Sequence, residues 1–122
     1  MNIVNLTPHA IVVRLADGTD RTFPPSGGVC RCTPIADPAL SIDGIPTVMS
    51  SFGPLSGLPR PVEGTIYLVS APAAQKAAQI GRGDVCSPDT GPTAIRQPAT
   101  LADGSQNPKA GQVVAVLGFQ RF

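Results

Sequence analysis

The stretch Gly64-Thr65-Ile66-Tyr67-Leu68-Val69-Ser70-Ala71-Pro72-Ala73-Ala74-Gln75-Lys76-Ala77-Ala78-Gln79-Ile80-Gly81 decides the fold. Its first part, residues 64–69, is apolar from Ile66 onward and predicts a central β-strand. Ser70 can then serve as an N-cap, and Pro72 falls in the first helical turn, where its missing N–H does no harm. The alanines that follow form a narrow apolar stripe, which predicts a helix ended by Gly81.

Short strands are predicted on the N-terminal side of this stretch. The segments 2–6 and 10–15 are rich in β-branched residues, and Thr7-Pro8-His9 separates them because proline cannot donate to a central ladder. Further strands are expected at residues 19–23 and 29–33, with turns at Asp17-Gly18 and at residues 24–28.

Other segments are dominated by residues that break regular structure. We expect residues 34–40 to be irregular because they contain two prolines, and residues 53–61 to form a loop of alternating Gly and Pro. Asp43-Gly44 predicts a hairpin turn between residues 41–42 and 45–52. Residues 97–111 are polar and show little hydrophobic periodicity. Residues 112–119 predict a final strand.

These patterns together predict about seven short strands and one Ala-rich helix near residues 71–80. We therefore expect a mainly β (α+β) fold, a small barrel or sandwich, with the helix over one edge or face. A length of 122 residues fits a single domain spanning residues 1–122. The 13 glycines and 14 prolines imply many turns between short elements.

The overall charge and composition argue against several classes of partner. The formal net charge is +1, so no broad basic face is available for duplex nucleic acid. Aromatic residues make up 4% of the chain, too few for the stacking platforms of single-strand binders. No run of 18 apolar residues exists, and the N-terminal residues lack the basic and apolar regions of a signal peptide. We expect a cytoplasmic protein without a membrane partner.

The three cysteines, Cys30, Cys32 and Cys86, do not follow a zinc-binding pattern. Zinc sites usually show C-x2-C pairs, and a four-ligand site here would need all three thiols together with His9. Small buried or half-buried thiols in a reducing cytosol are the simpler interpretation. No metal and no cofactor are therefore expected.

The segment Arg82–Arg96 is the most polar and the most conformationally restricted window of the chain. It contains two arginines, two aspartates, three hydroxyls, two glycines and two prolines. Because Pro fixes φ and Gly permits turns that other residues cannot make, we expect an ordered loop that presents polar groups.

Four segments resemble small uncharacterised proteins of bacteriophages, prophages and the bacteria that carry them. They are Val4–Ala10, Pro24–Gly27, Gly64–Ser70 and Arg82–Pro92, and they occur in the same order over most of the chain. The resemblance implies a genomic context, the cytoplasm of an infected or lysogenic bacterium, and it implies no particular chemistry. Relatives are expected to have two acidic residues where this chain has Gly83-Asp84, so position 83 is assigned no role.

A site for a small anionic ligand is predicted from the arginines and hydroxyls. Arg31, Arg82 and Arg96 present planar forks that match phosphate or carboxylate, and Ser70 at a helix start would add backbone N–H groups. The alternative is ordinary pairing of these arginines with aspartates close in sequence. The predicted ligand-binding residues are Asn5, Thr7, His9, Arg31, Ser70, Arg82, Asp84, Ser87, Asp89, Thr90, Thr93 and Arg96.

Motifs of known chemistry have simpler interpretations here. Asp89-Thr90-Gly91 is the signature triplet of aspartic proteases, but Ser87-Pro88 precede it where that family has a hydrophobic strand, so an Asx-turn is preferred. Arg82-Gly83-Asp84 is the integrin-binding triplet, which a cytosolic chain does not use. His9 is the sole candidate for proton transfer at neutral pH, with Cys86 and Ser87 as the nearest candidate nucleophiles.

Three hypotheses follow from these residues. The first is a small phage-type binding protein that sequesters a nucleotide-derived host defence signal in a polar Arg/Thr/Ser pocket. Pockets of this kind often lie between subunits, so a homo-oligomer is plausible. The second is a structural or protein-interaction accessory of a phage, and the third is a small hydrolase that uses Asp89 or His9. We favour a non-enzymatic protein and assign no catalytic residue.

Overall fold

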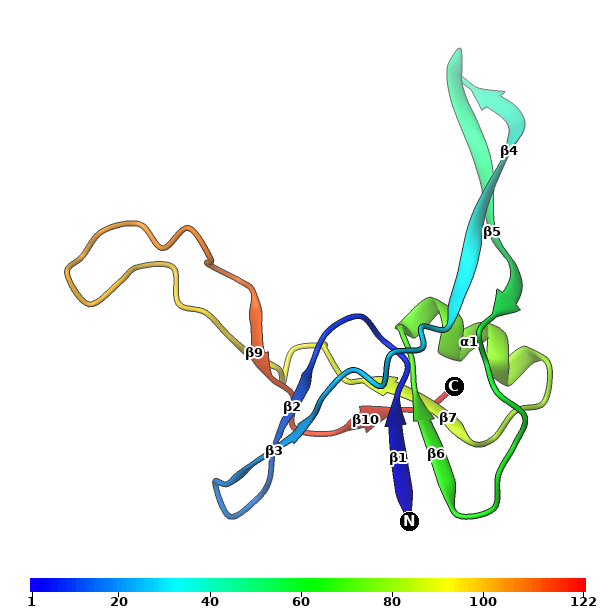
Figure 1. The fold of residues 1–122 in the computed structure, drawn as a ribbon. Coiled ribbons are helices and arrows are strands. Elements are labelled where there is room, and N and C mark those ends of the chain that lie inside the picture. The colour runs from blue at the N-terminus through cyan, green and yellow to red at the C-terminus, as the bar shows by residue number, and fades with distance from the viewer.

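The computed structural model describes all residues 1–122 and confirms a mainly β fold with a single helix (Figure 1). The elements are β1 (Asn2–Asn5), β2 (Ile11–Arg14), β3 (Asp20–Phe23), β4 (Arg31–Ile42), β5 (Ile45–Ser56), β6 (Thr65–Leu68), α1 (Ala71–Gln79), β7 (Val85–Pro88), β8 (Ile95–Arg96), β9 (Val113–Ala115) and β10 (Phe119–Gln120). The strands lie in four small sheets and do not close into a barrel.

The central sheet has the strand order β1-β6-β7-β10. β1, β6 and β7 are parallel, and β10 runs antiparallel to β7. The helix α1 connects the neighbouring parallel strands β6 and β7, as expected for a crossover between parallel strands. β6 therefore has a partner on each side, which confirms the prediction that this strand is central.

The central sheet is covered on both faces. Alternation along β6 and the residue after it sends Tyr67 and Val69 into a cluster with α1, whereas Leu68 joins a cluster on the opposite face. That second cluster is built with residues of the hairpin β2–β3, including Ile11 and Phe23. The body is thus three layers deep, with α1 and the β2–β3 hairpin outside and the sheet between them.

The alanines of α1 allow the helix to lie directly on the sheet. Ala73 and Ala77 have no exposed surface, and Ala74 is almost fully buried. No larger side chain fits between the helix and the sheet at these positions. The single helix lacks the length and apolar character that crossing a membrane requires.

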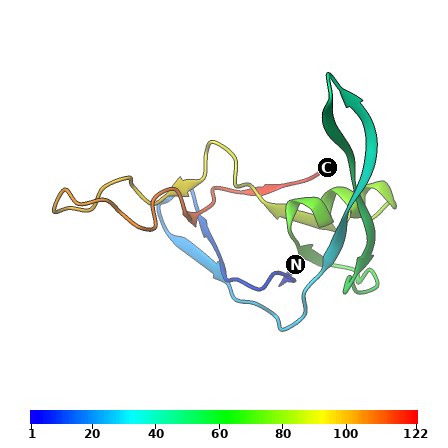
Figure 2. The same ribbon diagram turned by 90° about the horizontal axis from the view of Figure 1, so that it is seen from above.

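Two arms extend from the body in different directions, as both views show (Figures 1 and 2). The first is the hairpin β4–β5, in which two strands of 12 residues pair with each other alone. The second is the connection between β8 and β9, which contains Gln97–Gln112 and a bridge between Thr100 and Gln106. Only 20 of the 122 residues are buried, because the arms contribute little to the core.

The arm β4–β5 corrects the expectation that residues 34–40 are irregular. β4 continues through Pro34 and Pro38, which pair with Phe52 and Val48. Proline is tolerated here because β4 has only one neighbour, so its missing N–H groups can face the open edge. β5 likewise continues to Ser56, beyond the predicted start of a loop, with register shifts on both sides of the paired segment.

The C-terminal third differs from the prediction in two places. The predicted loop 82–96 contains the buried strand β7 and the short strand β8. Asp89 therefore does follow a strand, although its sequence context argued otherwise. The predicted strand 112–119 is divided into β9 and β10, which belong to different sheets.

Candidate ligand-binding site

A cavity of about 630 Å³ lies where the parallel strands end. Residues at or just after the carboxyl ends of β1, β6 and β7 all contribute to it: Thr7-Pro8-His9, Val69-Ser70-Ala71, and Pro88 with Thr90. The opposite wall is formed by Ala10–Val12 and Gln112–Val116. In open sheets with parallel strands this edge is where ligands bind, and the volume is within the range of small-molecule sites.

Asn5 shapes the loop that forms one wall of the cavity. Its side-chain amide is almost fully buried and donates to the carbonyl oxygens of His9 (2.8 Å) and Phe23 (2.9 Å). Its carbonyl oxygen accepts hydrogen bonds from the backbone N–H of Thr7 (2.9 Å) and the hydroxyl of Thr7 (2.7 Å). Asn5 is thus a structural hub that fixes the loop, and its own side chain is not part of the cavity lining.

Ser70 lies at the point where α1 meets the cavity. It is the N-cap residue in an extended conformation, but its hydroxyl makes no capping hydrogen bond, and no acidic residue occupies the first turn. The first backbone N–H groups of a helix have no intrahelical partner, and the helix dipole makes this end positive. Ser70 and Ala71 therefore give the cavity an end that favours an anionic group.

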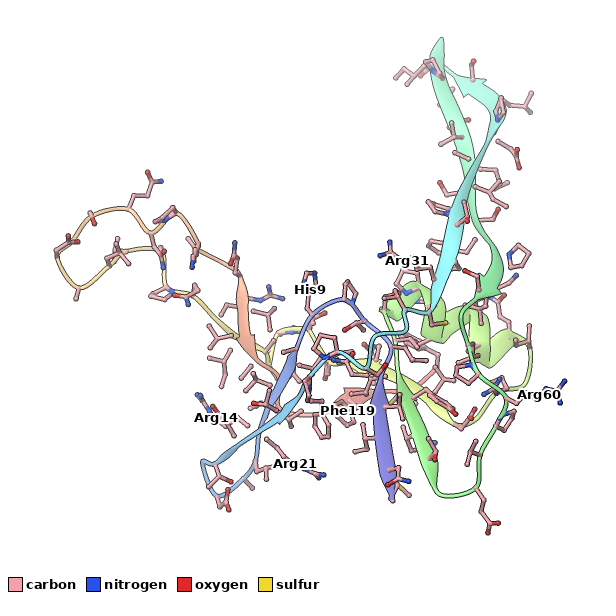
Figure 3. The ribbon with its side chains drawn as sticks, in the orientation of Figure 1. His9, Arg14, Arg21, Arg31, Arg60 and Phe119 are labelled. Atoms are coloured by element: carbon pink, nitrogen blue, oxygen red, sulfur yellow. The ribbon has the colours of Figure 1, made fainter.

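Arg31 lies beside this end of the helix in a smaller cavity of about 140 Å³. The two cavities share Thr7, Pro8 and Ser70. Figure 3 shows Arg31 and His9 projecting from the same side of the body, Arg31 from the start of β4 and His9 from the loop after β1. The Arg31 side chain thus places a cation next to the positive end of α1. The His9 imidazole belongs to the larger cavity, which adjoins that of Arg31 at the shared residues.

Two of the predicted arginines lie elsewhere and are engaged by the protein itself. The Arg82 guanidinium donates twice to the Asp84 carboxylate (both 2.9 Å) and once to the carbonyl oxygen of Pro59 (2.9 Å). Arg96 donates to the carbonyl oxygens of Gly111 and Thr90. Neither side chain lines the cavity at the carboxyl edge. Internal pairing, the alternative considered from the sequence, describes Arg82 and Asp84.

Three further predicted residues lie near the cavity without lining it. The Asp89 carboxylate accepts the N–H of Gly91 (3.1 Å), which confirms the Asx-turn. Thr93 is exposed outside the cavity. Ser87 is fully buried in β7, and its hydroxyl has no hydrogen-bond partner. His9 is therefore not paired with Ser87, and no nucleophile–base pair is formed.

The cysteines belong to different parts of the core. Cys30 lies in the cluster on the α1 face, with Cys32 packed against it, and Cys86 lies in the cluster on the opposite face. All three are free thiols, and burial raises the pKa of Cys30 and of Cys86. Cys30 and Cys86 are thus held in the neutral form, as small apolar side chains. No three His, Cys, Asp or Glu side chains lie together as a metal site would need.

One wall of the cavity could not be predicted from the sequence pattern. Gln112, Val113 and Val114 line it from β9 and the residue before it, whereas the pattern predicted only a strand there. The apolar character of this segment is visible in the sequence. Its position against the start of β2 depends on long-range contacts, such as the hydrogen bond from Val116 N–H to the Val12 carbonyl oxygen (2.9 Å).

Comparison with known proteins adds no relative: neither a family model, nor a curated protein, nor a solved structure matches this chain. The fold and the site therefore define the class of protein, a small mainly β domain with a cavity at the carboxyl edge of three parallel strands.

Proposed function

We propose that this protein is a phage-type binding protein that holds a small, nucleotide-derived anion in the cavity at the carboxyl edge of β1, β6 and β7. The observation that carries the proposal is the composition of this cavity. Its lining is mostly apolar and includes a few polar side chains, of which Thr7 and Ser70 also line the adjoining cavity of Arg31. Small-molecule sites combine an apolar wall with a few placed polar groups in this way.

The two parts of the site suit the two parts of a nucleotide. The apolar wall of Pro88 and Val113 offers a surface for a planar base. The uncapped start of α1 at Ser70, with Arg31 in the adjoining cavity, offers donors and positive charge for a phosphate. A ligand that reaches from one cavity to the other would pass over the residues that they share.

Sequestration is favoured over catalysis because no reactive pair faces the cavity. His9 lines it, but Ser87 is buried without a hydrogen-bond partner and the Asp89 carboxylate is occupied by the turn it caps. General-base catalysis requires a base within hydrogen-bond reach of its proton donor. We therefore expect the ligand to be released intact, as a host defence signal held by a phage protein would be.

Native mass spectrometry with a panel of cyclic and ADP-ribose-derived nucleotides tests this proposal. We expect one class of nucleotide to remain bound with unchanged mass after incubation. The variant Thr90→Glu places a negative charge at the exposed rim of the cavity and should abolish binding. Arg31→Ala should weaken binding by about tenfold or more, since it removes one charge-assisted contact.

Two matched variants control this experiment. Thr100→Glu makes the same change on the distant β8–β9 arm, and Arg82→Ala removes an arginine that pairs internally. Both should bind like the wild type once folding is verified. Binding that Thr90→Glu leaves intact, or that Arg82→Ala alone abolishes, would contradict the proposed site. A bound nucleotide that changes mass would favour the hydrolase.

A further inference from the structure

The chain exposes more surface than a compact monomer of its size, because two arms extend from its body (Figure 1). A compact monomer of 12.5 kDa has about 6,200 Å² of accessible surface, whereas this chain exposes 8120 Å². The excess of about 1,900 Å² exceeds the roughly 800 Å² that each partner buries in a standard interface. The excess accessible surface is therefore large enough for one subunit contact of ordinary size or larger.

The apolar surface is concentrated at the tip of the arm. Leu40, Ile42 and Ile45 are 90%, 66% and 63% exposed, around the Asp43-Gly44 turn. Along the arm, the cross-strand pairs Pro34–Phe52 and Pro38–Val48 share one face, which carries no charge. A solvent-facing hairpin needs none of these side chains, and contiguous exposed apolar surface marks an interaction site.

The base of the same arm forms a matching apolar groove. A cavity of about 530 Å³ lies between the arm and α1, lined by Ile35, Phe52, Gly53, Pro54, Leu55, Lys76 and Ile80. Its sole charge is that of Lys76, and the tip of the arm carries Asp43. The tip and the groove are thus complementary both in apolar character and in charge. A hairpin cannot fold back on its own base, so a tip that fills this groove would come from another molecule.

The β4 edge of the arm opposes growth by strand addition. Pro34 and Pro38 are four residues apart, so they remove donors from the same edge of β4. Prolines on an edge prevent further strands from pairing. The arm is therefore suited to docking by its side chains and unsuited to extending a sheet.

We propose that the β4–β5 arm is a dimerisation arm, whose tip docks in the groove between the arm and α1 of a second copy of this chain. The contact is reciprocal, because each copy has one tip and one groove. The two arms run in opposite directions about a two-fold axis near their middle, where the uncharged faces pack. This inference is independent of the ligand-binding site, which lies at the carboxyl edge of the sheet.

Sedimentation velocity over a wide concentration range tests the proposal with exposed-site variants. The wild type should be a dimer. Ile45→Asp at the tip and Ile80→Lys in the groove should each weaken dimerisation by about a hundredfold or more, since they place a charge in an apolar contact. Val62→Asp, at an exposed apolar residue outside the arm and the groove, should remain a dimer. Circular dichroism should show the same fold for all four proteins.

Mixing the two variants separates this arrangement from any other self-association. An equimolar mixture of Ile45→Asp and Ile80→Lys chains should recover dimers, because each mixed dimer keeps one intact tip-and-groove contact and pairs opposite charges at the other. A monomeric wild type, tip and groove variants that dimerise like the wild type, or a mixture that stays monomeric would each overturn the proposal.

Discussion

Asn5 shows how one buried amide can position a whole loop. All of its hydrogen-bonding capacity is used. The side-chain oxygen accepts two hydrogen bonds from Thr7, and the side-chain nitrogen donates one each to the carbonyl oxygens of His9 and Phe23. Polar groups buried without partners cost far more than an ordinary hydrogen bond contributes. The loop after β1, and with it one wall of the cavity, therefore depends on this side chain.

We expect Asn5→Ala to lower the free energy of unfolding by about 2–4 kcal/mol, because it leaves buried backbone groups without a hydrogen-bond partner and creates a cavity. Urea unfolding followed by circular dichroism measures this loss. Asn2→Ala, at an exposed position of the same strand, is the matched control and should change little. Equal effects of the two variants would show that the amide does not hold the loop.

The ion pair between Arg82 and Asp84 makes stability depend on pH. The Arg82 guanidinium lowers the pKa of the Asp84 carboxyl below its ordinary value. Ionised Asp84 therefore stabilises the fold above the pKa of the unfolded chain, near 4, and this stabilisation is lost as the pH falls through the lower folded pKa.

Asp84→Asn should lower the free energy of unfolding by about 1–2 kcal/mol at pH 7, because a half-buried charge-assisted pair is lost. The difference from the wild type should shrink as the pH is lowered below about 4. Urea titrations at a series of pH values measure it. Asp20→Asn, in the more exposed pair with Arg14, should have a smaller effect. A pH-independent difference would contradict this assignment.

At the scale of elements, α1 is defined by the small size of its buried side chains. Ala77→Leu should lower the free energy of unfolding by about 1–3 kcal/mol, because the added atoms have no space between the helix and the sheet. Gln79→Leu places the same side chain on the exposed face and should be nearly neutral. Thermal unfolding of both variants measures the contrast. A neutral Ala77→Leu would mean that the helix can move away from the sheet.

Elements with a clear local pattern could be predicted from the sequence. The strand at residues 64–69, the helix after it and the N-terminal hairpin follow from periodicity, capping and the Asp17-Gly18 turn, and the structure confirms them. β7 was missed because its four residues are flanked by polar breakers and include Ser87. The start of β4 was predicted as part of a strand at residues 29–33, but its continuation through residues 34–40 was missed because prolines signal irregular structure unless the strand is known to be an edge.

The sheet topology could not be predicted in the same way. A barrel or sandwich was expected, but three strands are parallel and the rest are divided among small sheets. Strand direction depends on which distant segments pair, and local pattern does not contain that information. The same reason explains the site: the residues at the strand ends come together, while Arg82 and Arg96 find acceptors closer to them.

At the scale of the whole molecule, the body and the β4–β5 arm are separable. The hydrophobic residues of the arm that pack against the core cluster are Cys32 and Leu55, and they are paired with each other. We expect a chain in which Asn-Gly replaces residues 33–54 to fold cooperatively, because a two-residue turn can join Cys32 to Leu55. Urea unfolding should show one transition with a smaller denaturant dependence, since less surface becomes exposed.

The shortened chain also separates the two proposals. It lacks the dimerisation arm and keeps the cavity at the carboxyl edge, so we expect a monomer that still binds the ligand. Native mass spectrometry reports both properties in one measurement. A shortened chain that is folded and still dimeric would place the subunit contact elsewhere.

The register of the central sheet sets the order in which this protein can assemble during synthesis. Asn2 pairs with Thr65, and Phe119 pairs with Pro88, so β1 has no strand partner until β6 has been made, and β7 gains its second partner only with β10. Closing such long loops before any contact is gained makes folding slow. The nascent chain therefore carries an unpaired β1 until β6 emerges, and the central sheet is completed only after β10 has emerged.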